Sequence, residues 1–527
     1  MTRSALKEIY LRQRSKLVGA LMLLLVLTLS SLSVSGHAKL LRSQPAANAT
    51  LKQAPRTVEL WFSEELEPPM CHIIVTDQNG NRVDKNNGSL AEGNKKQQID
   101  LEELQSGTYT VDWMVLSTDQ HTMKGKFTFT VALSGSTGSA PSTARSPGAQ
   151  EAGKTQPPQE SSPAPQSMQE SGTGWTQSLI RWLKYLAMMM LTGGFAFHAL
   201  VLGPALRRSR SMSDAQRAGA ISASDRRIIF LSWLSLALLV IVTLVELVLQ
   251  AASVFNQSVG GVLSPSLLNQ IITRTGFGAS WRLQVWAVAS LLVLVIYLSR
   301  NIKRDPARDH RMWWWSSLVA GAVLLLAPSW TGHAVVAAKE FPFAIVSDWL
   351  HLLAAGFWVG GLFHLALTLP KALADLKGPA RLDVLHRVIP LFTRLAIAST
   401  ILIVLTGLYN SWMHVDRFGE LWSTPYGETL LVKVLLVVPM LVLGGINTFI
   451  IHPRVRRLIE NGEDDPGAEG QNLEHNFARS VTVEAALGAL VLLVASVLVF
   501  LQPAREHPTA MSQNKSMDRI VTEYLKQ

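Results

Sequence analysis

Cysteine is almost absent from this chain, since its 527 residues include one, Cys71. A single cysteine excludes an intrachain disulfide framework, so any secreted part has to fold on its own hydrophobic core. Cys71 precedes the apolar run 73–75. We expect it to be a buried strand residue rather than a thiolate ligand.

Charged residues are also scarce, at 16%, whereas hydrophobic residues make up 48% of the chain. This balance, with the apolar residues gathered in long runs, excludes one soluble domain and predicts a membrane protein. The chain also lacks the phosphate-binding pattern G-x-x-x-x-G-K-[ST] and the aspartyl-phosphate signature D-K-T-G. Direct coupling to ATP is therefore not expected.

The net charge of +10 comes mainly from Lys and Arg in short loops between hydrophobic segments, so we expect no nucleic-acid partner. Eight segments are long enough to span a bilayer. They begin near Leu179, Ile228, Trp281, Met312, Phe343, Pro390, Thr429 and Thr482. Basic loops follow the first, third, fifth and seventh segments, which predicts that these loops are cytoplasmic. We expect an all-α bundle over residues 175–503 in the cytoplasmic membrane and an extracytoplasmic tail over 504–527.

Residues 1–36 have the form of a signal peptide, with a basic start, an apolar run over 17–29 and small residues over 33–36. Cleavage after Gly36 would make His37 the new N-terminus. The alternative is an uncleaved anchor, with His37 an incidental surface residue. The apolar run is shorter than a span requires, which favours cleavage.

Short runs of alternating polarity fill residues 37–133 and predict a compact, all-β Ig-like sandwich. The apolar positions are Val58, Leu60 and Phe62, then Tyr109, Val111, Trp113 and Val115, then Phe127, Phe129 and Val131. Residues 134–174 are rich in Ser, Pro, Gln and Gly and predict a disordered linker. The linker would let the outer domain range over the membrane surface.

Asp119 and His121 lie between the last two strong strands, two residues apart. In extended chain they point the same way. With the amine and imidazole of His37 they would make a nitrogen and oxygen set suited to Cu(II). The spacing alone fits equally an aspartate that caps a turn beside an exposed histidine.

The segment 342–370 is apolar enough to span a bilayer yet carries Asp348, His351 and His364. Ionisable groups in a membrane segment normally face a bundle interior, and we interpret these as functional. Asp348 and His351 share a helix face, so the carboxylate could hold the imidazole. Gly356 and Gly360 form a small-xxx-small pair that predicts a close helix approach.

Further candidates for a membrane path are His333 at the outer end of the fourth span and His198 toward the cytoplasmic end of the first. The thioethers of residues 188–190 would suit Cu(I), and His414 and His452 lie near other span ends. Each has an alternative: interfacial histidines for His333, His414 and His452, helix-end packing for His198 and His364, and lipid-facing filler for the methionines.

The outer segment resembles the CopC family of secreted copper-binding β-sandwiches. The motifs are His37-Ala38, Ser43-Gln44-Pro45-Ala46, residues 60–68, Gly107-Thr108-Tyr109, Trp113 and residues 117–121. The resemblance implies that His37, Asp119 and His121 bind Cu(II). The methionine-rich run that some members use for Cu(I) is absent.

The membrane half resembles the CopD family of membrane copper proteins. The motifs are residues 331–334, 348–361, 423–433 with the pattern S-x-x-Y-G-x-x-L-x-x-K, 447–449 and 479–484. A CopC module fused to a CopD module resembles the YcnJ type of copper uptake protein. It implies a transporter rather than an enzyme, with copper and the lipid membrane as partners and an extracellular copper chaperone or reductase as a further candidate. The alternatives are a copper-dependent redox protein and a haem-binding electron-transfer protein.

Overall fold

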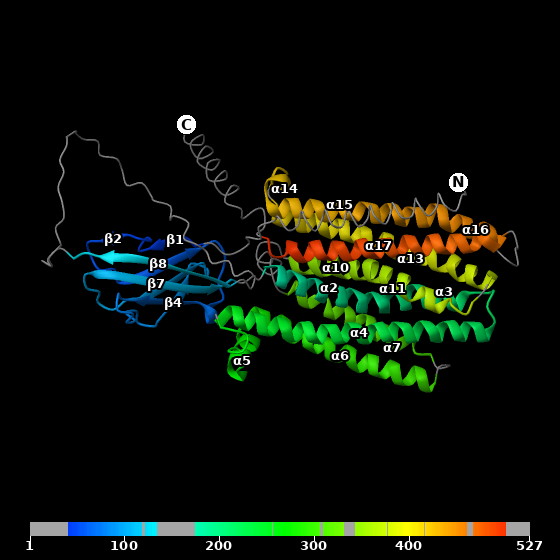
Figure 1. Cartoon of the computed structure of the whole chain (residues 1–527), viewed down its shortest axis with the longest axis horizontal. Coiled ribbons are helices and arrows are strands. Elements are labelled where there is room, and N and C mark those ends of the chain that lie inside the picture. The colour runs from blue at the N-terminus through cyan, green and yellow to red at the C-terminus, as the bar shows by residue number, and fades with distance from the viewer. Residues whose placement is uncertain are drawn as a thin grey trace, which may run out of the picture.

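A computed structural model shows a β-sandwich at one end of a long helical bundle (Figure 1). It describes residues 40–117, 122–133, 174–255, 257–305, 309–330, 343–376, 378–415, 417–460 and 467–501. The predicted signal peptide, most of the predicted linker and all of the predicted tail lie outside these residues. So do His37, Asp119, His121 and His333.

In the described part of the chain the sandwich consists of two four-stranded sheets, with strand orders β1-β3-β6-β5 and β2-β8-β7-β4. Neighbouring strands are antiparallel, apart from β2, which runs parallel to β8. The strands are β1 (Leu40–Gln44), β2 (Thr50–Leu51), β3 (Thr57–Phe62), β4 (His72–Thr76), β5 (Ser89–Ala91), β6 (Lys96–Asp100), β7 (Gly107–Leu116) and β8 (Thr122–Val131), with a short helix η1 (Pro68–Met70) before β4. The predicted all-β sandwich is confirmed.

Alternating side chains build the core between the two sheets, as the sequence predicted. Val58, Leu60 and Phe62 of β3 are buried, and their neighbours are partly exposed. Phe62 packs edge-on against Trp113, with ring centroids 5.3 Å apart. Trp113 also lies over Gly125, its register partner on β8, where any added Cβ would overlap the indole. A strand that buries one face must alternate in this way, because successive side chains point to opposite faces.

The described part of the chain contains eight helices that are long and apolar enough to cross a membrane. Their elements are α2 (Gly174–Ala196), η2 (Phe197–Leu202) and α3 (Gly203–Arg208), then α4 (Asp214–Phe255), α6 (Gly276–Arg304), α7 (Arg311–Leu324) with α8 (Leu326–Ser329), α10 (Ala344–Ala355), η3 (Gly356–Gly360) and α11 (Gly361–Leu367), α13 (Gly378–His414), α15 (Pro425–Ile446), η4 (Asn447–Ile451) and α16 (His452–Glu460), and α17 (Gly467–Leu498). Short helices α5 (Pro265–Arg274), α12 (Leu369–Ala372) and α14 (Glu420–Ser423) lie in the connections. The predicted eight-helix bundle is confirmed.

Several spans contain a turn of π-helix, and one of these turns makes the closest contact in the bundle. The turn η3 packs against α2, where Gly360 lies on the backbone of Met189 and Gly193. A Cβ on Gly360 would overlap the carbonyl group of Met189. The close approach predicted from Gly356 and Gly360 is therefore confirmed, and small residues are what make it sterically possible.

Candidate functional site

The sandwich rests on the bundle at the end of the hairpin that carries Asp119 and His121. Strands β7 and β8 stay paired up to Leu116 and Thr122, so residues 117–121 join their ends. Leu116 is 1% exposed and packs with Val254 of α4 and Ile271 of α5 in a shared hydrophobic cluster. Figure 1 shows the sandwich beside the ends of α4 and α5.

A polar contact supports the same junction. The backbone N–H of Gly276, at the start of α6, donates to Glu67, with 3.0 Å between the nitrogen and Oε1. An acidic group at a helix N-terminus is favoured by the helix dipole and by the unpaired N–H groups there. The predicted copper-binding segment thus begins one residue after a side chain that is buried against the bundle.

Cys71 has no thiolate character. Its thiol donates to the carbonyl oxygen of Glu67, with sulfur and oxygen 3.1 Å apart, and the residue packs against the sandwich core. Burial raises the pKa of the Cys71 thiol to about 12. Cys71 lies directly before β4 and is partly buried, so the expectation of a buried strand residue is wrong in its details, whereas the raised pKa agrees with the expectation that it is not a thiolate ligand.

Asp348 and His351 share a face of α10, but the expected hydrogen bond between them is not formed. The hydroxyl of Ser329, at the end of α8, donates to Asp348 Oδ2 at 2.6 Å. His351 Nδ1 instead lies 3.0 Å from Thr406 Oγ1 on α13. The interpretation of Asp348 as the group that orients His351 is therefore wrong, because each side chain faces a nearer partner on another helix.

The contacts of Thr406 fix the protonation of the His351 ring. The Thr406 hydroxyl donates to the carbonyl oxygen of Leu402 at 2.6 Å, so it can only accept from His351. The proton is therefore on Nδ1, and Nε2 keeps its lone pair. This is the tautomer that a metal-binding imidazole needs, and the Thr406 hydroxyl and the backbone of Ile403 both lie beside the ring.

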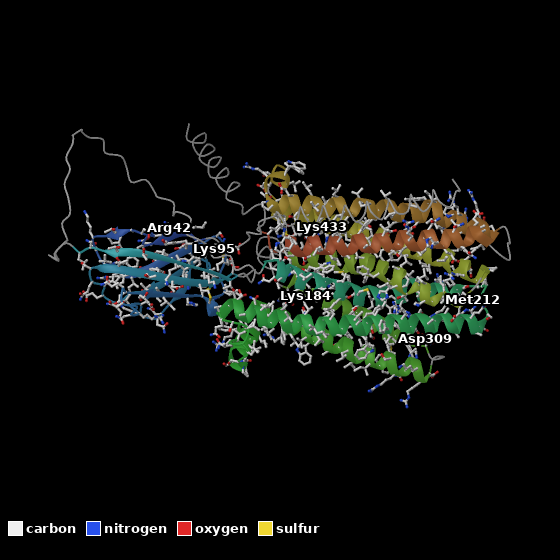
Figure 2. All side chains as sticks on the ribbon, viewed as in Figure 1. Arg42, Lys95, Lys184, Met212, Asp309 and Lys433 are labelled. Carbon is white, nitrogen blue, oxygen red and sulfur yellow. The ribbon has the colours of Figure 1, made fainter. Side chains whose placement is uncertain are left out.

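Asp348 belongs to a wider polar cluster in the half of the bundle near the sandwich. Lys433 and His414 both act electrostatically on its carboxyl group. The ring of His414 stacks on Tyr426, with centroids 6.0 Å apart. Figure 2 shows Lys433 and Lys184 in this half, whereas Met212 and Asp309 lie at the far end. The sequence signal for Lys433 was a lysine within an apolar run.

A buried ion pair that sequence reasoning missed joins α2 and α4 in the same half. Lys184 Nζ lies 2.7 Å from Glu246 Oε1, and the side chains are 13% and 15% exposed. Each of the two is a charged residue within an apolar run of the sequence, so each could be recognised there as unusual. Their pairing was not visible, because 62 residues separate them.

His364 is held by hydrogen bonds at both ring nitrogens and by close packing. Nε2 lies 2.9 Å from the carbonyl oxygen of Met190, so it carries the proton, and Nδ1 lies 3.0 Å from Thr368 Oγ1. The side chain is 1% exposed and fills the space beside Gly194. These contacts support the helix-end packing alternative, since a metal would have to displace one of them.

His198 has an acidic neighbour that the sequence did not reveal. Its Nδ1 lies 3.4 Å from Asp225 Oδ1 on α4, and its ring stacks on Trp314 at 3.9 Å between centroids. Neither His198 Nδ1 nor Asp225 Oδ1 has a hydrogen-bond partner in the described part of the chain. His198 therefore keeps a nitrogen and a nearby carboxylate that are unoccupied by protein groups.

A histidine pair also lies near the ends of α13 and α16. The rings of His386 and His452 stack almost in parallel, with centroids 5.0 Å apart. A porphyrin does not fit between rings in direct contact, so this pair gives no support to the haem alternative.

The described residues contain no group of three or more His, Cys, Asp or Glu side chains that could hold a metal ion. Within the described bundle, His351, His198 and His364 lie in separate places, each with its own partners. Any metal held there would rest on one or two protein groups at a time. The roles of His37, Asp119, His121 and His333 stay predictions, because these residues lie outside the described part of the chain.

The fold and the junction define a class, a multi-pass membrane protein with a β-sandwich seated on one end of an eight-helix bundle. Three family models match the chain: "CopC domain" over residues 40–132, "Copper resistance protein D-like, N-terminal domain" over 168–339, and "Copper resistance protein D" over 386–498. The chain belongs to the CopC and CopD families of copper resistance proteins, with both domains in one polypeptide.

Known relatives cover the whole chain or its parts. "Copper transport protein CutJ" of Bacillus subtilis is 27% identical over 94% of this chain and 80% of its own length. "Copper resistance protein D" of Pseudomonas syringae pv. tomato is 28% identical over 62% of this chain and 96% of its own. The crystal structure of CopC from Methylosinus trichosporium OB3b is 31% identical and covers 19% of this chain and 98% of that one, with a TM-score of 0.18.

Proposed function

We propose that this protein captures Cu(II) outside the cell through His37, Asp119 and His121 and passes copper across the cytoplasmic membrane into the cell. The observation that carries the proposal is the junction at Leu116. The segment with Asp119 and His121 follows a strand end that packs on α4 and α5. Copper released from it would therefore arrive at the bundle and not in bulk solvent.

Charge distribution supports an outer position for the sandwich. The basic residues Arg207 and Arg208 end the first span, and Lys303 and Arg304 end the third. These loops are at the end of the bundle away from the sandwich, as the position of Met212 and Asp309 in Figure 2 indicates. Basic loops favour the cytoplasmic side, so the sandwich would face outward.

His351 is the residue best prepared to receive copper in the bundle. The contact of Nδ1 with Thr406 leaves the Nε2 lone pair available to a metal. Asp348 and Lys433 lie in the same outer half of the bundle. Imidazole binds both oxidation states of copper, so the site suits transfer with or without reduction. An extracellular reductase or copper chaperone would act before this step. A negative membrane potential inside the cell would then favour entry of the cation.

Cellular copper content under copper limitation tests the proposal. Cells with the intact chain should accumulate more copper than cells without it, and His37→Ala and His351→Ala should each lose the difference. Thr406→Val leaves the His351 side chain in place but removes its hydroxyl partner, so it should lose part of the gain. His72→Ala, at an exposed histidine of the same sandwich, is the matched control and should behave as the intact protein. Equal copper content in all these strains would refute uptake.

A further inference from the structure

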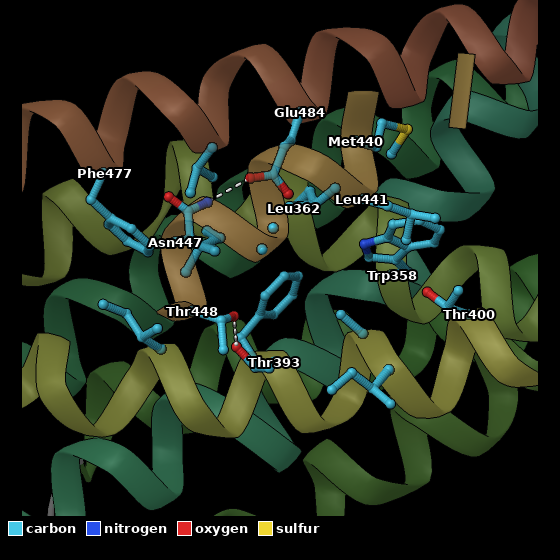
Figure 3. A pocket seen from close by; sticks show the side chains of 18 of the residues that line it. Trp358, Leu362, Thr393, Thr400, Met440, Leu441, Asn447, Thr448, Phe477 and Glu484 are labelled. Atoms are coloured by element: carbon cyan, nitrogen blue, oxygen red, sulfur yellow. Dashed lines mark hydrogen bonds between the residues drawn. The ribbon is translucent and has the colours of Figure 1, made fainter. Parts of the chain in front are cut away.

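A pocket of about 210 Å³ lies between α13, η4 and α17, and none of the histidines above lines it (Figure 3). Its walls are mainly apolar, with Trp358, Phe392 and Met440 among them. Ile397 and Phe449 at its rim are 55% and 80% exposed on the outside of the bundle. In a membrane this rim faces lipid, so the pocket is closed to bulk water on that side.

Glu484 is the one ionisable side chain that lines this pocket in the described part of the chain. It is 3% exposed and lies near the start of the apolar part of α17, which begins near Thr482. Asn447 Nδ2 donates to Glu484 Oε1 at 2.6 Å, as Figure 3 shows, and the Ser480 hydroxyl lies 3.5 Å from the same oxygen. Asn447 Oδ1 is buried with no hydrogen-bond partner among the described residues.

No cation among the described residues forms an ion pair with Glu484. The elements around the pocket carry many charged and titratable groups. These are Arg181, Lys184 and Tyr185 on α2, His364 on α11, Arg381, Asp383, His386, Arg387, Arg394, Tyr409 and His414 on α13, Tyr426, Glu428 and Lys433 on α15, His452, Arg454, Arg456, Arg457 and Glu460 on α16, and Glu469, Glu474, His475 and Arg479 on α17. None of these lines the pocket, and within the described residues none forms an ion pair with Glu484. Lys184 is paired with Glu246, and Glu474 with Arg381.

A lone carboxylate buried in an apolar pocket is costly, so a bound ligand that neutralises Glu484 would be favoured. A hard metal ion requires about six oxygen ligands, and copper prefers nitrogen or sulfur. The pocket offers one carboxyl group, an amide, the hydroxyl of Thr400, and the hydroxyls of Thr393 and Thr448, which bond to each other at 3.0 Å. The ligand that this set suits is a proton.

We propose that Glu484, positioned by Asn447, is a proton-binding site in the membrane, and that exchange of its proton is coupled to copper passage. The coupling rests on the proposed copper transport, whereas proton binding does not. The link is structural: the pocket shares Trp358 with the helix that carries His351. Gly488, one turn beyond Glu484, packs on Val359 of the same helix. Loss of the proton would place a charge against this contact and so favour a different packing of the two helices.

Carbodiimide labelling of the full chain in lipid nanodiscs without copper tests proton binding. Carbodiimides modify neutral carboxyl groups in apolar surroundings. Peptide mass spectrometry should find Glu484 labelled at neutral pH and progressively less as pH rises. Glu474 is the internal control, because it lies on the same helix but is paired with Arg381 at 2.8 Å, and it should stay unlabelled. Glu484→Gln should remove the label without loss of the folded protein. Absence of label on Glu484 at every pH would overturn the site.

Proteoliposomes with an internal pH dye test the coupling. Copper addition should drive a proton flux in the intact protein and in the control Glu474→Gln. The variant Glu484→Gln should lose this flux. In Glu484→Gln, copper entry should also no longer respond to an imposed pH gradient. An unchanged response in Glu484→Gln overturns the coupling. If the intact protein moves no copper, the proposed transport and the coupling both fail, and the labelling still decides whether Glu484 binds a proton.

Discussion

The contact between Glu67 and Gly276 gives a direct test of whether the sandwich is seated on the bundle. Replacing Glu67 with Ala removes the acceptor for the Gly276 N–H and the negative charge at the N-terminus of α6. A hydrogen bond to a charged group contributes about 1.5–3 kcal/mol. A charge at a helix end adds about 0.3–1 kcal/mol.

The Gly276 N–H is exposed to solvent, so screening reduces these values. We take about 1–2 kcal/mol for the loss in docking free energy, which lowers the ratio of docked to undocked protein by a factor of about 5–30. Glu67→Gln keeps an acceptor oxygen but loses the charge, and it should fall between Glu67→Ala and the native protein. The hydrophobic cluster around Leu116 remains in both variants, so docking should weaken rather than disappear.

Pulsed electron paramagnetic resonance between spin labels at Lys85 of the sandwich and Ser258 after α4 measures the docked fraction. Both sites are exposed, and the native Cys71 thiol is unreactive at the labelling pH. The distance distribution should be narrow in the native protein and in the control Glu103→Ala, which changes an exposed carboxylate near the opposite end of β7. It should broaden in Glu67→Ala. A distribution that is equally narrow in Glu67→Ala would refute the junction as a contact of this strength.

The other predictions concern packing, charge and thiol reactivity. Gly360→Ala should lower the thermal stability of the bundle in detergent. Gly445→Ala should not, because a Cβ at Gly445 would meet open space. Equal melting temperatures for the two variants would contradict the close approach of η3 and α2. Lys184→Met should destabilise by about 3–5 kcal/mol, because Glu246 stays buried and unpaired, and Lys184→Met with Glu246→Leu should recover most of it; a double variant as unstable as the single one would count against this reasoning. Cys71 should resist alkylation at pH 8 in the folded protein and react after denaturation. Its raised pKa means that the folded state holds the thiol proton more tightly, so stability should fall as pH rises from 9 toward 12.

The strands of the sandwich were predictable because each buries one face. Alternation over Val58, Leu60 and Phe62 forces those side chains to one side of β3, and a sandwich needs apolar side chains on that side only. The sheet order was not predictable, since β3 pairs with β6 and β1 across long separations. Which strands pair depends on the three-dimensional path of the chain, and the alternation of apolar and polar residues along one strand gives no information about that path.

The spans were predictable in number but not in their limits. Helix α4 begins at Asp214, well before the predicted start near Ile228, and α13 begins at Gly378 rather than near Pro390. In both cases the helix extends through a polar, basic segment beyond the apolar run. Hydropathy reports where lipid begins, whereas the backbone hydrogen bonds of a helix continue into water.

The candidate membrane site was predictable only as a set of exceptions. Asp348 and His351 stood out as polar groups in an apolar run, but their hydrogen-bond partners, Ser329 and Thr406, are 19 and 55 residues away. Serine and threonine are common in membrane helices and give no signal of their own. Sequence therefore identified which side chains need a partner, and the fold determined which partner each one has.

The partners separate the ionisable groups of the bundle into two kinds. Glu246 forms an ion pair with Lys184 that joins α2 and α4, whereas the Asp348 carboxyl group accepts from the Ser329 hydroxyl and lies within electrostatic reach of Lys433. Glu484 has only amide and hydroxyl neighbours in the described structure. A group held by a cation loses that ion pair when it binds anything else, whereas a group held by neutral donors can gain and lose a proton within the same contacts. By this argument the Glu246 carboxylate, paired with Lys184, is structural, and Glu484 is the group whose charge can change during the proposed transport cycle.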